Sequence, residues 1–185
     1  MKSLSLRRLT FAALVAAVYA VLTIVLAPIS YGPIQCRISE VLCILPFFLP
    51  YTAWGLFVGC IIANLLSPVG VFDVIFGSLA TLGCCLCTAA IGRRSDWRSW
   101  DRKWDGAKWA KCALACFMPV IWNAVIIGAL LALFYAEEGK AKSALFFIYG
   151  AEVGLGELIV MYVLGLPLMR ILPLSKLKTV LDRAV

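Results

Sequence analysis

The stretch VLCILPFFLPYTAWGLFVGCIIANLL, residues 41–66, is almost entirely apolar and carries prolines at positions 46 and 50. It is longer than the roughly 20 residues with which an α-helix crosses about 30 Å of hydrocarbon. Proline removes a backbone donor and clashes with the preceding turn, so a helix interior accepts it only where the chain bends. The stretch is therefore either one long span or two short helices that meet near Pro50.

The rest of the chain has the composition of a membrane protein. Of the 185 residues, 63% are apolar and 15% are charged, which leaves too little polar surface to cover a water-soluble protein of this length. Further apolar segments cover Leu9–Pro28, Val71–Ile91, Trp109–Tyr135 and Ser143–Leu168. The first begins like a signal peptide, but its apolar run continues to Pro28 without a convincing cleavage site, so we expect a retained span.

Basic residues decide how often residues 41–66 cross the membrane. The polar segment 92–111 and the N-terminus are both rich in Lys and Arg, and the positive-inside rule places such segments in the cytoplasm. An even number of crossings must then separate them, so residues 41–66 cross twice. We predict an all-α integral membrane protein, a single bundle of six transmembrane helices with the second and third short and bent, and with both termini inside.

On this prediction, residues 1–185 form one multi-pass domain in the cell membrane, with a basic cytoplasmic loop at 92–111 and a cytoplasmic tail at 170–185. The Lys and Arg residues that remain outside are Arg37, Lys140 and Lys142. The net charge of +7 is then explained by membrane orientation and headgroup attraction, and no nucleic-acid partner is expected.

Three tryptophans in the basic loop, Trp97, Trp100 and Trp104, are three and four positions apart. Such spacing places side chains on one face of a helix. We expect an interfacial amphipathic helix that either anchors to lipid headgroups or docks a cytoplasmic partner.

Seven of the eight cysteines lie in apolar segments, and the chain has no histidine. We interpret them as small packing residues. A thiolate metal cluster that includes Cys84, Cys85 and Cys87 is the alternative.

Polar side chains at membrane depth are few, and each is a functional candidate because burying charge in lipid is costly. The candidates are Arg37, Glu40, Asn64, Asp73, Asn123, Glu152 and Glu157. In the predicted topology the first four fall at the outer ends of their helices, so the whole set can converge on an outward-facing cavity. The structural alternative is that Arg37 and Glu40 pair with each other and that Asp73 caps a helix.

The two glutamates of the last segment cannot both point straight at one ligand. At about 100° per residue, Glu152 and Glu157 project about 140° apart on a straight helix. Gly150, Gly154 and Gly156 allow close packing or a local distortion that brings the carboxylates nearer. We favour Glu157 as the ligand contact.

Ala12, Ala16 and Ala20 form a stripe of small residues on the first helix, with Ala13 and Ala17 beside it. This pattern lets another helix approach closely, either within the bundle or from another protein. No phosphate-binding Gly-rich loop is present, so the chain cannot hydrolyse ATP unaided, and the lack of histidine disfavours metal-dependent or triad catalysis.

Four segments resemble one family closely: YGPIQCRISE at 31–40, WGLFVGCIIANLLSP at 54–68, FDVIFGSLATL at 72–82 and GLGELIVMYVLGLPL at 154–168. The chain resembles the queuosine-precursor transporter (QueT) family, substrate-binding (S) components of energy-coupling-factor (ECF) importers. The resemblance is nearly full-length and weakest in the basic loop, and Cys36 stands where a larger apolar residue is expected. It implies a non-enzymatic bundle without a cofactor that captures a deazaguanine, such as queuine or a precursor, from outside.

The resemblance also implies a coupling membrane protein and two ABC ATPases as partners, with the Ala12, Ala16 and Ala20 stripe meeting the coupling protein. The outer loop Ser30–Ser39 would help to close over the ligand. Import would be driven by toppling of the binding subunit within the membrane.

A deazaguanine presents N–H donors that suit a carboxylate and a carbonyl that suits an amide donor. Glu157 or Glu152 would take the first role and Asn123 or Asn64 the second. The candidates for an aromatic wall against the flat base are Trp122, Tyr149 and Phe76. Arg37 and Glu40 would secure the loop or touch the substituent.

Three other hypotheses stay open. The cargo can be another vitamin-like or nucleobase-like solute. The protein can instead be a small intramembrane enzyme with Glu152 and Glu157 as acid and base. It can also be a structural assembly factor without a ligand. The sequence does not discriminate among nitrile, aminomethyl and complete queuine bases.

Overall fold

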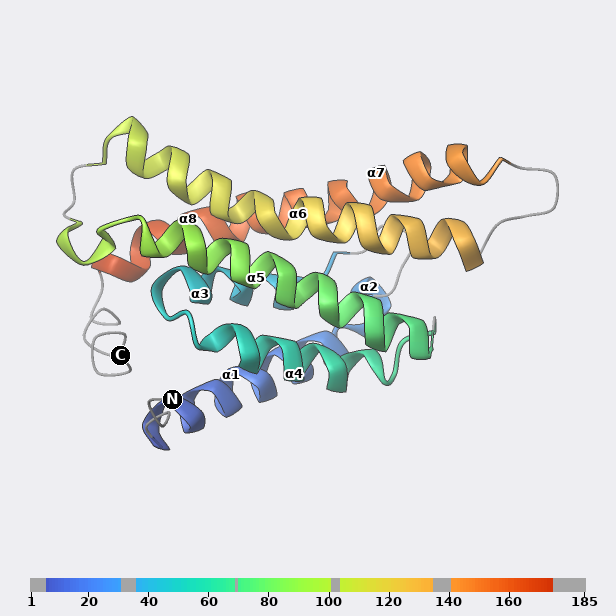
Figure 1. Cartoon of the computed structure of the whole chain (residues 1–185), viewed down its shortest axis with the longest axis horizontal. Helices are drawn as coiled ribbons and strands as arrows, with labels where there is room; N and C mark the ends of the chain where they lie inside the picture. The colour runs from blue at the N-terminus through green and yellow to red at the C-terminus, as the bar shows by residue number, and fades with distance from the viewer. Residues whose placement is uncertain (1–5, 31–35, 69, 101–103, 135–140, 175–185) are drawn as a thin grey trace.

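The computed structural model describes residues 6–30, 36–68, 70–100, 104–134 and 141–174, and every regular element in these ranges is helical (Figure 1). The α-helices are α1 (Leu6–Val25), α2 (Ala27–Ser30), α3 (Leu45–Phe48), α4 (Thr52–Asn64), α5 (Ser78–Arg93), α6 (Gly106–Phe134), α7 (Lys142–Val160) and α8 (Leu166–Ile171). The 3₁₀ segments η1 (Ile38–Ile44) and η5 (Leu172–Leu174) and the π segments η2 (Asp73–Gly77) and η4 (Met161–Gly165) continue into these helices, whereas the 3₁₀ turn η3 (Trp97–Ser99) stands alone between α5 and α6.

Within the described residues, four helical stretches are long and apolar enough to cross a membrane. They are Leu6–Val25, Asp73–Arg93, Gly106–Phe134 and Lys142–Leu174. Ile38–Phe48 and Thr52–Asn64 are shorter apolar helices. The helical path is interrupted at Pro50, between α3 and α4, as its ring predicts. An all-helical bundle of membrane type is confirmed, whereas six crossings and the orientation stay predictions.

The long helices pack as two pairs with α5 between them. The helix α6 packs against α7, α1 packs against α4, and α5 contacts both α6 and α4 (Figure 1). The start of α1, the end of α5, the start of α6 and α8 lie at the same end of the molecule, on the left of Figure 1. The described basic residues of these helix ends, Arg8, Arg93 and Arg170, are therefore grouped at one end.

Small residues allow the paired helices to approach closely. A Cβ atom added at Gly59 of α4 would lie 2.6 Å from the carbonyl oxygen of Ala16 on α1. A Cβ atom at Gly128 of α6 would lie 2.7 Å from the Cα atom of Gly150 on α7. Larger side chains at these glycines would push the helices apart.

The tryptophans of the basic loop do not form the expected amphipathic helix in the described residues. Only Trp97–Ser99 makes a short 3₁₀ turn, and residues 101–103 of this segment lie outside the described ranges. Trp97 packs edge-on against Phe48, with ring centroids 5.2 Å apart, and Trp100 packs against Phe47 at 5.8 Å. Both tryptophans are buried in the core, so they fasten the loop to α3 instead of facing lipid headgroups.

Candidate functional site

The 3₁₀ segment η1 carries Glu40 into the middle of the bundle. This short segment contacts α1, α4, α5, α6, α7 and η4. Just before it, the Cys36 thiol lies 3.9 Å from the carbonyl oxygen of Gly156 on α7. Because η1 is surrounded by other helices, the apolar residues of ISEVLCI pack against them. The polar residues Ser39 and Glu40 of the same segment are buried as well.

A buried ion pair joins the start of η1 to the start of the helical stretch Asp73–Arg93, called the α5 stretch below. The guanidinium of Arg37 lies 3.2 Å from the Asp73 carboxylate, and both side chains are buried. The Asn64 amide, at the end of α4, donates to the carbonyl oxygen of Asp73 at 3.0 Å. Asp73 lies in the first turn of η2, after Phe72 at the N-cap position, and its carboxylate pairs with Arg37. These three predicted residues therefore meet, and they meet through Asp73.

Glu40 is fully buried and is surrounded by neutral donors. The Tyr19 hydroxyl of α1 donates to its Oε1 atom, and the Thr81 hydroxyl of α5 lies 3.5 Å from the same oxygen. The Cys43 thiol donates to Oε2 at 3.0 Å. Tyr19 and Thr81 were not among the predicted site residues. The available signal was that a hydroxyl at membrane depth must find a partner.

Asn123 and Glu157 connect α6 to α7. The Asn123 amide nitrogen donates to Glu157 Oε1 at 3.2 Å, and the side chains are 3% and 1% exposed. Within the described part of the chain, the second oxygen of Glu157 and the amide oxygen of Asn123 have no hydrogen-bond partner. Buried polar atoms are almost always paired. This pair therefore offers two acceptors to a ligand that brings N–H or O–H donors.

The segment η1, which carries Glu40, contacts α6 and α7, and the Cys36 thiol just before it reaches Gly156 next to Glu157. The ion pair, the Glu40 group and the Asn123–Glu157 pair are thus parts of one buried cluster. The elements that build it are far apart in the sequence, and η1 joins them.

Four other predicted residues are not joined to this cluster. Trp122 is half-buried, and its ring lies against α5, where a Cβ atom at Gly83 would be 2.7 Å from Cζ3. Tyr149 and Glu152 are also half-buried. No hydrogen bond or ion pair links either of them to the cluster in the ranges that the structure describes. Phe76, the third candidate for an aromatic wall, is 45% exposed.

The alanine stripe of α1 packs inside the chain. Ala16 and Ala20 are buried, and the carbonyl oxygens of Ala12 and Ala16 are in close contact with Gly55 and Gly59 of α4. The expectation that this stripe faces a partner protein is corrected here, because α4 already occupies it. The neighbouring Ala13 and Ala17 are exposed.

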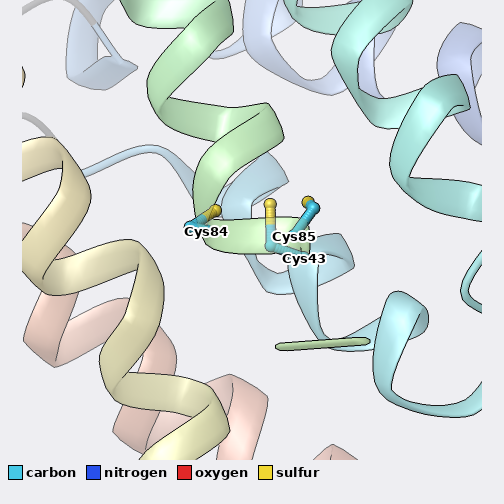
Figure 2. Close-up of side chains that lie close together, drawn as sticks. All are labelled: Cys43, Cys84 and Cys85. Carbon is cyan, nitrogen blue, oxygen red and sulfur yellow. The ribbon is translucent and has the colours of Figure 1, made fainter. Parts of the chain in front are cut away.

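Three cysteines gather beside Glu40. The sulfur atoms of Cys43, from η1, and of Cys84 and Cys85, from α5, lie within 4.8 Å of one another (Figure 2). Three thiolates would suit a soft metal ion such as zinc or copper(I). The thiols of Cys43 and Cys84 instead act as neutral donors, to Glu40 and to the carbonyl oxygen of Thr81 at 3.1 Å. Cys87, which the sequence grouped with Cys84 and Cys85, is not in this group.

A cavity of about 580 Å³ lies between the start of α1, the end of α5 and the α3–α4 connection, and none of the residues of the polar cluster lines it. Its lining includes Arg8, Trp54, Arg93 and Trp97. We place the candidate site at the polar cluster, because Asn123 and Glu157 hold unpaired buried acceptors there on facing helices. Among the described residues that line the cavity, the only such atom is the Tyr51 hydroxyl.

The comparisons with known proteins agree with a transporter. A family model described as "QueT transporter" matches residues 9–173. A protein named "Queuosine precursor transporter QueT", from Lactococcus lactis subsp. cremoris (strain MG1363), is 49% identical over 72 residues, which cover 38% of this chain and 42% of that relative. No solved structure matches. Because the family model spans nearly the whole apolar bundle, this multi-pass membrane protein belongs to the QueT transporter family.

Proposed function

We propose that this protein is the membrane-embedded substrate-binding subunit of an ECF-type importer, and that it captures a deazaguanine precursor of queuosine from outside the cell. Family membership and the name of the Lactococcus relative support the cargo class. The observation that carries the proposal is the buried Asn123–Glu157 pair with its two unpaired acceptor oxygens.

The chemistry of this pair suits the edge of a deazaguanine. The ring N–H and the exocyclic amine are adjacent donors, and a carboxylate such as that of Glu157 can accept from both. The amide of Asn123 adds an acceptor oxygen and a second N–H, which can donate to the ring carbonyl. A guanine-like edge therefore satisfies atoms that are otherwise buried without partners.

The partners follow from the family resemblance and from the absence of a nucleotide-binding motif in the sequence. A coupling membrane protein and two ABC ATPases would supply the energy for import. On α1, the exposed Ala13 and Ala17 offer a close-contact surface for the coupling protein, because the stripe next to them is covered by α4.

Calorimetry on the detergent-purified protein tests the proposal. The ligands are queuine, its aminomethyl and nitrile precursors, and guanine as a control. We expect saturable binding of at least one deazaguanine, and Glu157→Gln should weaken it strongly. Glu152→Gln is the matched control on the same helix and should keep most of the affinity. If none of these bases binds, the deazaguanine proposal fails, and a wider panel of vitamins and nucleobases would test the other cargo hypothesis.

A further inference from the structure

The candidate site holds more negative than positive charge. Among the described residues, the buried side chains that carry a formal charge are Arg37, Glu40, Asp73 and Glu157. One guanidinium therefore faces three carboxylates. These side chains are at most 3% exposed, so bulk water and dissolved salt screen the excess charge poorly.

The single cation is not shared equally among the carboxylates. Arg37 forms its ion pair with Asp73 at 3.2 Å. The described partners of Glu40 are the hydroxyls of Tyr19 and Thr81 and the thiol of Cys43. Glu157 receives a neutral amide N–H. Two carboxylates thus have hydrogen-bond donors but no cationic partner of their own in the described part of the chain.

These two carboxylates also act on each other. Glu40 lies on η1, which contacts both α6 and α7, the helices that carry Asn123 and Glu157. Two negative charges brought together in a buried site repel each other. A buried carboxylate without a counterion is costly, and its charge must be removed by a proton or balanced by a cation. A ligand that brings a positive charge supplies that balance, whereas a neutral ligand of the same shape does not.

We propose that this site selects deazaguanines with a positively charged amine substituent over neutral ones, and that Glu40 is the residue that determines this specificity. The inference rests on the proposed function, because it assumes that Glu157 and Asn123 hold the base edge. Glu40 then supplies the negative charge that attracts the substituent. Both the aminomethyl precursor and queuine carry such an amine, whereas the nitrile precursor and guanine do not.

The test compares dissociation constants of the wild-type protein for the aminomethyl deazaguanine, the nitrile deazaguanine and guanine. A charge-assisted hydrogen bond in place of a neutral contact corresponds to a preference of about tenfold to hundredfold for the aminomethyl base. Equal affinity for the aminomethyl and nitrile bases, or a preference for the nitrile, would overturn the inference while leaving the importer proposal standing. Binding of none of the three would instead count against the proposed function itself.

The variant Glu40→Gln tests whether Glu40 is the residue that causes the preference for the aminomethyl base. Glutamine keeps the size and an acceptor oxygen for Tyr19 but removes the charge. We expect the ratio of the two dissociation constants to fall close to one. A ratio that stays at the wild-type value would show that Glu40 does not determine the specificity. The wild-type comparison does not depend on this variant, so the inference is tested even if Glu40→Gln fails to fold.

Discussion

Arg37 and Asp73 are 36 positions apart in the sequence, and their side chains form a buried ion pair of 3.2 Å. The pair joins the residue before η1 to the first turn of the α5 stretch. The ion pair therefore helps to position the start of η1, the segment that carries Glu40.

Removal of one partner of this pair should destabilise the protein strongly. Asp73→Asn leaves the buried Arg37 charge without its carboxylate, which typically costs about 3–5 kcal/mol. Unfolding of the purified protein in mixed micelles measures the loss. The control is Asp96→Asn, because Asp96 is exposed and its loss should change the free energy of unfolding by no more than about 0.5 kcal/mol. Equal effects of the two substitutions would contradict the structural role of the ion pair.

The contact between α1 and α4 makes a second prediction. In Gly59→Ala the new Cβ atom would lie 2.6 Å from the Ala16 carbonyl oxygen, so the two helices must separate. Overpacking of this kind costs about 1–3 kcal/mol. Gly106→Ala is the control, because nothing lies within 4 Å of a Cβ atom at that position. Thermal unfolding should show a lower midpoint for the first variant and no decrease for the second.

The buried hydroxyl of Tyr19 should contribute more to stability than that of Tyr51. Tyr19→Phe removes a donor from the Glu40 carboxylate, and a hydrogen bond to a charged group is worth about 1.5–3 kcal/mol. The hydroxyl of Tyr51 is buried without a hydrogen-bond partner in the described residues, so Tyr51→Phe should be neutral or slightly stabilising. Denaturant titration of both variants checks this difference, and a larger loss for Tyr51→Phe would refute it.

The sequence predicted the features that depend on local chemistry. The helical path is interrupted at Pro50, as the proline predicted, although Pro119 lies inside the continuous helix α6. The polar residues that meet around η1 were predicted as site candidates because polar and charged side chains are costly at membrane depth. Which of them pair was not predictable, since Arg37 finds Asp73 only when η1 and the α5 stretch are brought together.

The wrong expectations share one physical cause. A periodic pattern shows that side chains gather on a face, but it does not show what the face contacts. The alanines of α1 do allow a close approach, and α4 of the same chain makes it. Trp97 and Trp100 have helical spacing, yet they lie at a short 3₁₀ turn and pack in the core against Phe48 and Phe47. Tyr19 was missed because its ring resembles the apolar residues around it in a hydropathy pattern.

The cluster of Cys43, Cys84 and Cys85 should not hold a metal ion in the folded protein. Metal binding requires thiolates, and further negative charge beside Glu40 in an apolar core is unfavourable. Elemental analysis of protein purified under reducing conditions and then exposed to zinc or copper(I) should find far less than one bound ion per chain. The matched control replaces all three cysteines by alanine and should give the same metal content. One equivalent of metal in the wild type that is lost in the triple variant would instead establish a thiolate site between η1 and α5.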